Sequence, residues 1–207
     1  MFQTLRTHPA WHGLLLGAFS LVAALILALG SDLTRAPIAA RAAEDLQLSL
    51  SQVIPAALYD NDLTSSIHML QDQTEGAVPV FVARRDGQVT ATAFELTGFG
   101  YAGAIRVLIG LAPDGQVLGV RVLAHAETPG LGDKIEIRKS PWIDGFAGRS
   151  LTNPPPSGWK VRKDGGVFDQ FSGATITPRA VVQTVARGLA LFDRHRSTVL
   201  AAPQEQT

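Results

Sequence analysis

The sequence has 207 residues, and its 18 basic and 18 acidic side chains give a formal net charge of zero. This balance argues against a nucleic-acid-binding protein, which usually carries clustered Lys and Arg, and a composition that is 46% hydrophobic excludes an intrinsically disordered chain. Charged residues make up 17% of the sequence, below the roughly 25% of soluble domains, and residues 1–30 contain only one of them, Arg6.

The first predicted element is an apolar helix near the N-terminus. Residues 13–30 read GLLLGAFSLVAALILALG without a charge, and as a helix they would span about 27 Å, close to the thickness of a hydrocarbon core. Trp11 stands where an aromatic ring suits the membrane interface. We therefore predict a transmembrane anchor over residues 11–31 and a cytoplasmic N-terminus at residues 1–10.

A cleavable signal peptide is the alternative for this segment. Ala28 and Gly30 supply small residues for cleavage, but the apolar stretch is longer than is usual for a signal peptide, which favours the anchor. The distribution of Arg6, Arg35 and Arg41 does not decide the orientation. An anchor this close to the N-terminus usually exports the chain that follows it.

Residues 32–77 are predicted to form a helical stalk and a linker. The stretch 34–58 is rich in Ala and Leu, which favour a helix, and Pro55 interrupts it. The polar stretch 59–77 is typical of a linker, so we expect the compact fold to begin near Val78.

Four apolar runs separated by turn residues predict an antiparallel sheet. Asp86-Gly87 and Pro113-Asp114-Gly115 supply the geometry of tight turns between the runs of each pair. The flanking residues are mostly Val, Ile, Leu and Ala, as in strands. The predicted strands cover residues 78–84, 88–96, 104–111 and 117–124.

The C-terminal part is predicted to contain a long loop and then a helix. Residues 150–159 include three consecutive prolines and are a loop. Residues 178–196 carry apolar side chains at helical spacing, with Thr177 suited to the N-cap and Pro178 to the first helical position. Residues 198–207 are predicted to be a tail. The expected fold class is α+β, with one N-terminal transmembrane helix followed by a domain with an antiparallel sheet and flanking helices.

Two glycine-containing segments are candidates for ligand binding. Gly98-Phe99-Gly100-Tyr101-Ala102-Gly103 allows a close backbone approach, although no helix follows it, so it is not a dinucleotide fingerprint. Residues 125–132, HAETPGLG, form a tight turn whose N–H groups can point at a polar ligand. His125 and Glu127 would lie on one face of a strand, but two ligands are too few for a zinc site.

The third candidate segment, residues 169–177, precedes the C-terminal helix and reads DQFSGATIT. Hydroxyl groups and a glycine at a helix N-terminus form a natural site for a phosphate, because the first N–H groups and the helix dipole favour an anion there. A helix cap without any ligand is the alternative. Nucleophilic catalysis is disfavoured because no Gly-x-Ser-x-Gly elbow precedes the helix, and the absence of Cys excludes thiolate chemistry.

These three segments together resemble the FMN-binding domain family. Asp-x-x-Ser-Gly-Ala-Thr at residues 169–175 matches the flavinylation motif of that family, and the runs at residues 100–103 and 127–132 match its other two landmarks in the expected order. One N-terminal span before a single such domain resembles the G subunit of the Rnf (Rsx) ion-translocating electron-transport complexes, which is related to the C subunit of the sodium-pumping NADH:quinone oxidoreductase. The resemblance covers about residues 10–196, and with the compact fold beginning near Val78 the FMN-binding domain is predicted at residues 78–197.

The resemblance implies a covalent cofactor and a set of contacts for it. FMN would be joined through its phosphate to the hydroxyl of Thr175, by a separate flavin transferase that uses FAD as donor. The other implied residues fall into four groups. These are the transferase motif and phosphate pocket (Asp169, Ser172, Gly173, Ala174), a further donor (Thr177), the flavin lining (Glu127, Thr128, Leu131, with Gly100, Tyr101 and Gly103 at the sheet edge), and a cation near the ring or phosphate (Lys163).

The function implied is an electron carrier within an ion-translocating NADH/ferredoxin oxidoreductase complex. The chain would be anchored in the bacterial inner membrane with its FMN domain on the periplasmic side, where no FMN pool would replace a lost cofactor. Its partners would be the other membrane and redox subunits, and we expect no catalysis by the chain alone. A membrane-anchored FMN-binding regulatory or accessory domain is the alternative, although relatives of that kind tend to carry further spans or ferredoxin modules.

Overall fold

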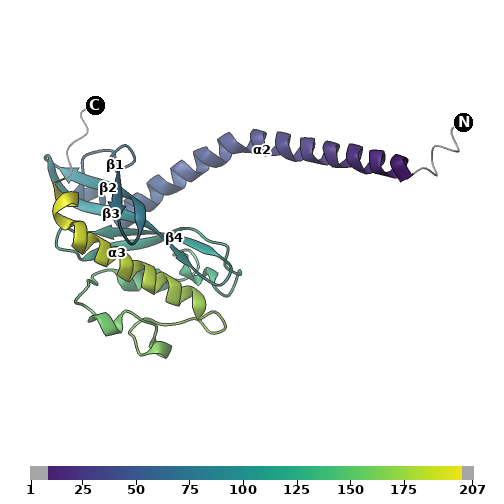
Figure 1. Cartoon of the computed structure of the whole chain (residues 1–207). Helices are drawn as coiled ribbons and strands as arrows, with labels where there is room; N and C mark the ends of the chain where they lie inside the picture. The colour runs from purple at the N-terminus through teal and green to yellow at the C-terminus, as the bar shows by residue number, and fades with distance from the viewer. Residues whose placement is uncertain (1–8, 202–207) are drawn as a thin grey trace, which may run out of the picture. The chain divides into compact units, whose positions relative to one another are not determined.

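The computed structural model describes residues 9–201, so the predicted N-terminal residues 1–8 and tail residues 202–207 lie outside the described part. The chain divides into two compact units, Met1–Glu44 and Asp45–Thr207. The first unit contributes most of one long helix, and the second unit contains the sheet and the C-terminal helix (Figure 1).

Helix α2 (Pro9–Val53) is continuous and contains Pro37. Many of its apolar side chains are exposed in the isolated chain. For example, Phe19 is 73% exposed and Leu27 is 74% exposed. Among residues 9–201 it is the one helix whose length and composition would let it cross a membrane, with a mean hydropathy of 2.4 in its most apolar window. The predicted N-terminal apolar helix is therefore confirmed, and the helical part of the stalk is its direct continuation.

The second unit is built on a five-stranded antiparallel sheet in which each strand pairs with the next along the chain. This confirms the predicted α+β class, the antiparallel sheet and the predicted pairing of residues 104–111 with residues 117–124. The strands are β1 (Ile67–Asp72), β2 (Gly76–Arg85), β3 (Gln88–Phe99), β4 (Ala104–Leu111) and β5 (Val117–Ala124).

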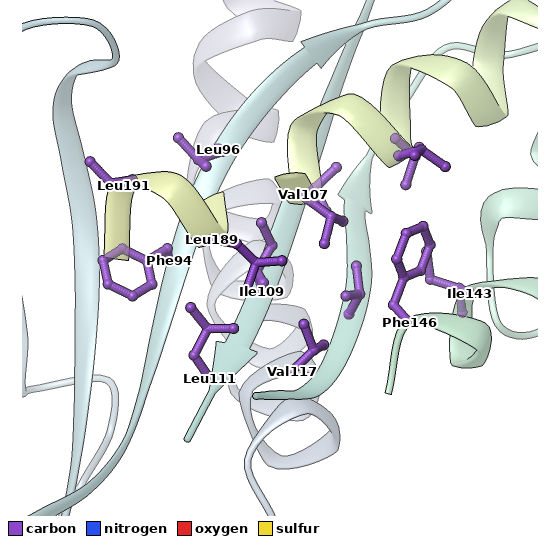
Figure 2. Packing of buried hydrophobic residues seen from close by; sticks show 14 of the residues in the cluster. Phe94, Leu96, Val107, Ile109, Leu111, Val117, Ile143, Phe146, Leu189 and Leu191 are labelled. Atoms are coloured by element: carbon purple, nitrogen blue, oxygen red, sulfur yellow. The ribbon is translucent and has the colours of Figure 1, made fainter. Parts of the chain in front are cut away.

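Helix α3 (Ile176–Leu200) covers one face of the sheet (Figure 1). Because side chains alternate between the two faces of a strand, Phe94 and Leu96 of β3 point to this layer together with Ile109 of β4. They meet Leu189 and its neighbours on α3, as Figure 2 shows. Phe94 also makes an edge-to-face contact with Phe192, with ring centroids 6.0 Å apart.

The opposite face of the sheet has a second, smaller core. Phe81 of β2 and Leu108 of β4 pack there with Leu50 and Val53 from the end of α2 and with Ile54, which follows it. Because both faces are covered, all four residues from Val80 to Ala83 are buried. The end of α2 is therefore part of the hydrophobic core of the second unit.

A long connection from β5 to α3 contains the short 3-10 helices η2 (Asp133–Ile135), η3 (Pro141–Phe146), η4 (Pro156–Gly158) and η5 (Arg162–Asp164). An aromatic cluster fixes this connection. Phe146 stacks on Phe168 with centroids 4.6 Å apart, and Trp142 meets Phe171 edge-on at 5.2 Å. The cluster holds the connection in a defined path up to the start of α3.

Three expected boundaries differ from the structure. The sheet begins at Ile67 instead of near Val78, because β1 lies within the expected linker. Every second residue of β1 is exposed, as at the edge of a sheet, so its sequence lacks a continuous apolar run. At the other end α3 continues to Leu200, and Val199 is buried, so residues 198–200 belong to the helix instead of a tail.

The start of α3 also differs from the prediction. The helix begins at Ile176 with Thr175 at the N-cap, whereas the sequence predicted Thr177 there. Thr177 lies inside the first turn and is fully buried. The difference has a physical reason, because the Thr177 hydroxyl has a partner in a distant segment of the chain.

Candidate functional site

A cavity of about 540 Å³ lies in the second unit where the three candidate segments meet. It is open to solvent and is lined by both polar and apolar groups. The lining residues are Tyr101, Glu127, Thr128, Leu131, Gly132, Lys163, Gly173, Ala174, Thr175, Ile176 and Thr177. The fold thus brings together three segments that are far apart in the sequence.

The turn between β3 and β4 forms one wall of the cavity. The N–H of Gly100 donates to the carbonyl of Gly103 over 2.8 Å, which closes the turn. Gly103 has a φ of +139°, a conformation that side chains disfavour. Tyr101 at the tip is 75% exposed and borders the cavity.

The segment that follows β5 forms the second wall. The N–H groups of Leu131 and Gly132 both donate to the carbonyl of Thr128 over 3.1 Å. Gly130 within this turn has a φ of +78°. The resulting loop places the Leu131 side chain, which is 44% exposed, at the mouth of the cavity.

Thr175 occupies the point where the third segment becomes helix α3. The N–H of Ala174 donates to the carbonyl of Phe171, and Gly173 with a φ of +80° allows this tight turn. The Thr175 side chain is half-buried, lines the cavity and makes no capping hydrogen bond. Its hydroxyl is therefore available to another group.

Thr177 has a different environment although it lines the same cavity. Its hydroxyl donates to Oε2 of Glu127, and both residues are buried. Oε1 of Glu127 accepts from the N–H of Ala102 over 3.0 Å. The Thr177 hydroxyl is thus committed to a protein partner.

An ion pair fastens the loop that carries Lys163 to α3. Arg179 donates to both carboxylate oxygens of Asp164, over 2.6 Å and 3.0 Å. This hydrogen bonding, together with the charges of Lys163 and Lys160, holds the pKa of Asp164 below its usual value, against the opposing effect of desolvation. The loop is thereby fixed with Lys163 beside the cavity.

Four of the predicted site residues lie outside the cavity lining: Gly100, Gly103, Asp169 and Ser172. Asp169 is exposed and pairs with Arg162 over 3.1 Å, and its carbonyl accepts from the indole N–H of Trp142. A Cβ on Gly100 would collide with Oε1 of Glu127, so this glycine accommodates a carboxylate.

Two lining residues, Gly132 and Ile176, were not predicted as site residues. Gly132 is the last residue of the glycine-containing run at residues 127–132, so that run was the signal that could have found it. Ile176 gave no signal, because an exposed apolar residue in the first turn of a helix resembles any surface position.

Residues 100–190 match the family model of the FMN-binding domain. The cavity suits this cofactor, since its volume lies within the range of small-molecule sites. Because the first N–H groups of a helix have no partner within the helix, the N-terminus of α3 at Ile176 is a favourable place for a phosphate. A flavin bound there would lie near the positive charge of Lys163 and the apolar side chains of Tyr101, Leu131 and Ile176, which line the cavity.

The chain is similar over nearly its whole length to curated proteins. It is 70% identical over 196 residues to the G subunit of the ion-translocating oxidoreductase complex of Cereibacter sphaeroides, which covers 95% of this chain and 90% of that protein. It is 46% identical over 198 residues to the protein of the same name from Stutzerimonas stutzeri, covering 96% and 86%. The structure is also similar to the C subunit of the Na⁺-translocating NADH-quinone reductase of Parabacteroides distasonis, with a TM-score of 0.44 and 24% identity over 70% of each chain. The chain belongs to the family of G subunits of ion-translocating oxidoreductase complexes.

Proposed function

We propose that this chain is a membrane-anchored electron-carrier subunit whose FMN is covalently attached to Thr175. The observation that carries the proposal is the Thr175 side chain, which lines the cavity at the N-cap of α3 without a capping hydrogen bond. A phosphate joined to this hydroxyl would lie at the N-terminus of a helix, where amides and the helix dipole stabilise negative charge.

The structure favours Thr175 over the two neighbouring hydroxyls as the point of attachment. Thr177 is fully buried and its hydroxyl donates to Glu127. Ser172 is exposed and lies outside the cavity lining. Thr175 combines partial exposure with a place on the cavity wall.

Attachment needs a flavin transferase and FAD. The Thr175 oxygen forms a bond to the phosphorus of the FMN half, the pyrophosphate bond of FAD breaks, and AMP leaves while the hydroxyl proton is released. The product is a phosphodiester that carries one negative charge. Asp169, Ser172, Gly173 and Ala174 would supply the sequence that the transferase recognises.

The bound flavin provides the electron chemistry, and the chain positions it. Leu131 and Ile176 on the cavity wall are 44% and 46% exposed, and Tyr101 is 75% exposed. Exposed apolar side chains around a cofactor site are typical of a surface that meets a partner protein. This arrangement supports a relay of electrons between other subunits of the complex, in a route that links NADH and ferredoxin to ion movement.

We further propose that α2 anchors the chain in the bacterial inner membrane with the FMN domain on the periplasmic side. A covalent link retains the cofactor in a compartment that has no FMN pool. Protease added to spheroplasts should remove the domain and leave the anchor. Protection of the domain until the membrane is lysed would contradict this orientation.

The attachment is tested with the full chain produced together with a flavin transferase and purified in detergent. The denatured protein should give a fluorescent gel band and a mass increase of one FMN less one water. Thr175→Ala should give a folded protein without either signal. Covalent flavin on Thr175→Ala would disprove attachment at this residue.

A further inference from the structure

The carboxylate of Glu127 connects all three segments of the cavity. Glu127 belongs to the second segment and is only 5% exposed. One of its oxygens accepts from the N–H of Ala102 in the first segment, and the other accepts from the hydroxyl of Thr177 in the third. Both oxygens therefore have partners within the protein.

Two glycines make room for this carboxylate. A Cβ on Gly132 would lie 2.8 Å from Oε2 of Glu127 and 2.9 Å from the hydroxyl oxygen of Thr177. A Cβ on Gly100 would collide with the other oxygen, Oε1. One glycine from each of two segments is thus explained by the position of Glu127, independently of any ligand.

A hydrogen bond to the His125 side chain fixes the main chain of Glu127. The Nδ1 atom of His125 accepts from the N–H of Glu127 over 3.0 Å, and Nε2 lies 2.9 Å from Oε1 of Glu136. Because Nδ1 accepts, the ring proton resides on Nε2 and is donated to Glu136. The position of Glu127 is therefore held at both its backbone and its side chain.

We propose that Glu127 is a positioning residue, which sets the place of the Thr175 hydroxyl through its hydrogen bond to Thr177 and has no direct contact with the FMN phosphate. The inference rests on the proposed attachment at Thr175. Thr177 lies in the first turn of α3, two residues after Thr175, so the bond to Glu127 fixes the helix end that presents the acceptor oxygen. A displacement of about 1 Å at a reacting group can reduce a rate about a hundredfold.

The main test measures the rate at which a flavin transferase loads full-length variants in detergent. Thr177→Val removes the hydroxyl and retains the shape, and should slow incorporation at Thr175 by about tenfold to a hundredfold. Thr177→Ser restores the hydroxyl and should recover most of the rate. Thr184→Val is the matched control, because Thr184 is also fully buried in α3 and its hydroxyl donates to Ala180 outside the cavity.

A second measurement uses the protein without flavin. Thr177→Val should accelerate hydrogen exchange of the Ala102 amide about fivefold or more, because the shared carboxylate loses one of its two anchors. Thr184→Val should leave this amide unchanged. Loading of Thr177→Val at the wild-type rate would overturn the inference, even if exchange of the Ala102 amide became faster.

If Thr177→Val fails to fold, variants of Glu127 still test the positioning role. In Glu127→Gln the amide oxygen can accept from Ala102, and its NH₂ can donate to a rotated Thr177 hydroxyl. Glu127→Gln should therefore load faster than Glu127→Ala by about tenfold. Equal loss in both folded variants would show that the negative charge is required, which contradicts a positioning role.

The outcomes separate this inference from the proposed function. Covalent flavin on Thr175→Ala would disprove the attachment site whatever Thr177→Val does. Absence of flavin on Thr175→Ala, together with normal loading of Thr177→Val, would disprove the positioning role alone.

Discussion

Gly110 of β4 lies directly against the main chain of Val53, the last residue of α2. A Cβ on Gly110 would be 2.9 Å from the carbonyl carbon of Val53 and 3.0 Å from its Cβ. The close contact lets the end of the helix seal the face of the sheet opposite α3.

Gly110→Ala should therefore destabilise the second unit by about 1–3 kcal/mol, because the backbone of Val53 would have to move. Thermal unfolding of the full chain in detergent would show a lower Tm. Gly145→Ala is the control, since a Cβ there meets no atom within 4 Å. Equal Tm values for the two variants would contradict the close packing.

Asp72 should make the stability of the domain depend on pH. Hydrogen bonds from the N–H of Glu75, from His195, from the N–H of Thr74 and from Arg194 hold the pKa of Asp72 well below its usual value, against the opposing effect of burial. A depressed pKa stabilises the fold at every pH above the unfolded-state pKa of about 4, and this stabilisation is lost as the pH falls below that value.

Asp72→Asn should consequently lower the Tm at pH 7 and flatten its decline between about pH 5 and pH 2. The two Tm curves should converge in acid. Asp193→Asn, at an exposed position of α3, is the control and should follow the wild type. A wild-type Tm that does not fall in this range would refute the prediction.

Trp142 should restrain the segment that carries Thr175. Its indole N–H donates to the carbonyl of Asp169 over 2.8 Å, and its ring packs against Phe171. Trp142→Phe retains an aromatic ring and removes the donor, so the turn closed by the Ala174 amide should open more often. Hydrogen exchange of that amide should become about fivefold faster, as expected for the loss of one hydrogen bond of about 1 kcal/mol.

Trp159→Phe provides the comparison for this prediction. It removes an indole hydrogen bond to Ser150, which lies outside the segment of Thr175. Exchange of the Ala174 amide should remain unchanged in this variant. The same acceleration in both variants would show a general loosening of the aromatic cluster.

Lys163 should raise the reduction potential of the bound flavin. Reduction places negative charge on the cofactor, and a nearby ammonium group stabilises that charge. Lys163→Gln should lower the potential in a redox titration followed by flavin absorbance, with a smaller difference at high salt. Lys160→Gln removes an exposed charge on the same loop, outside the cavity lining, and should have less effect. Equal shifts would mean that Lys163 acts only through the general field of the loop.

Local sequence patterns predicted the hairpin of β4 and β5 to the residue, because a turn and two apolar runs determine it. They missed β1, whose exposed side chains and Asp72 belong to an edge strand supported by α3. They also placed Thr177 at a helix cap. Its actual partner, Glu127, is 50 residues away, and no rule that uses neighbouring residues can detect such a pairing.

In the candidate site, too, local patterns were predictable from the sequence and contacts between distant residues were not. The three glycine- and hydroxyl-containing segments were recognisable one by one, and their resemblance to a family suggested that they act together. The role of Gly100 was not recognisable from the sequence. A side chain at this position would collide with Oε1 of Glu127, a residue that lies in another segment of the chain. The aromatic cluster behind the site was also missed, because Trp142, Phe146 and Phe168 are scattered through a stretch without regular periodicity.

The order of the strands has a consequence for synthesis on the ribosome. All five strands precede α3 in the chain, so the sheet can form while the face of Phe94 and Ile109 is still uncovered. Such a nascent chain needs protection from aggregation. The last helix, of 25 residues, begins next to the proposed acceptor and covers that face. A flavin transferase that acts on the folded cavity would therefore select only chains in which α3 has been synthesised.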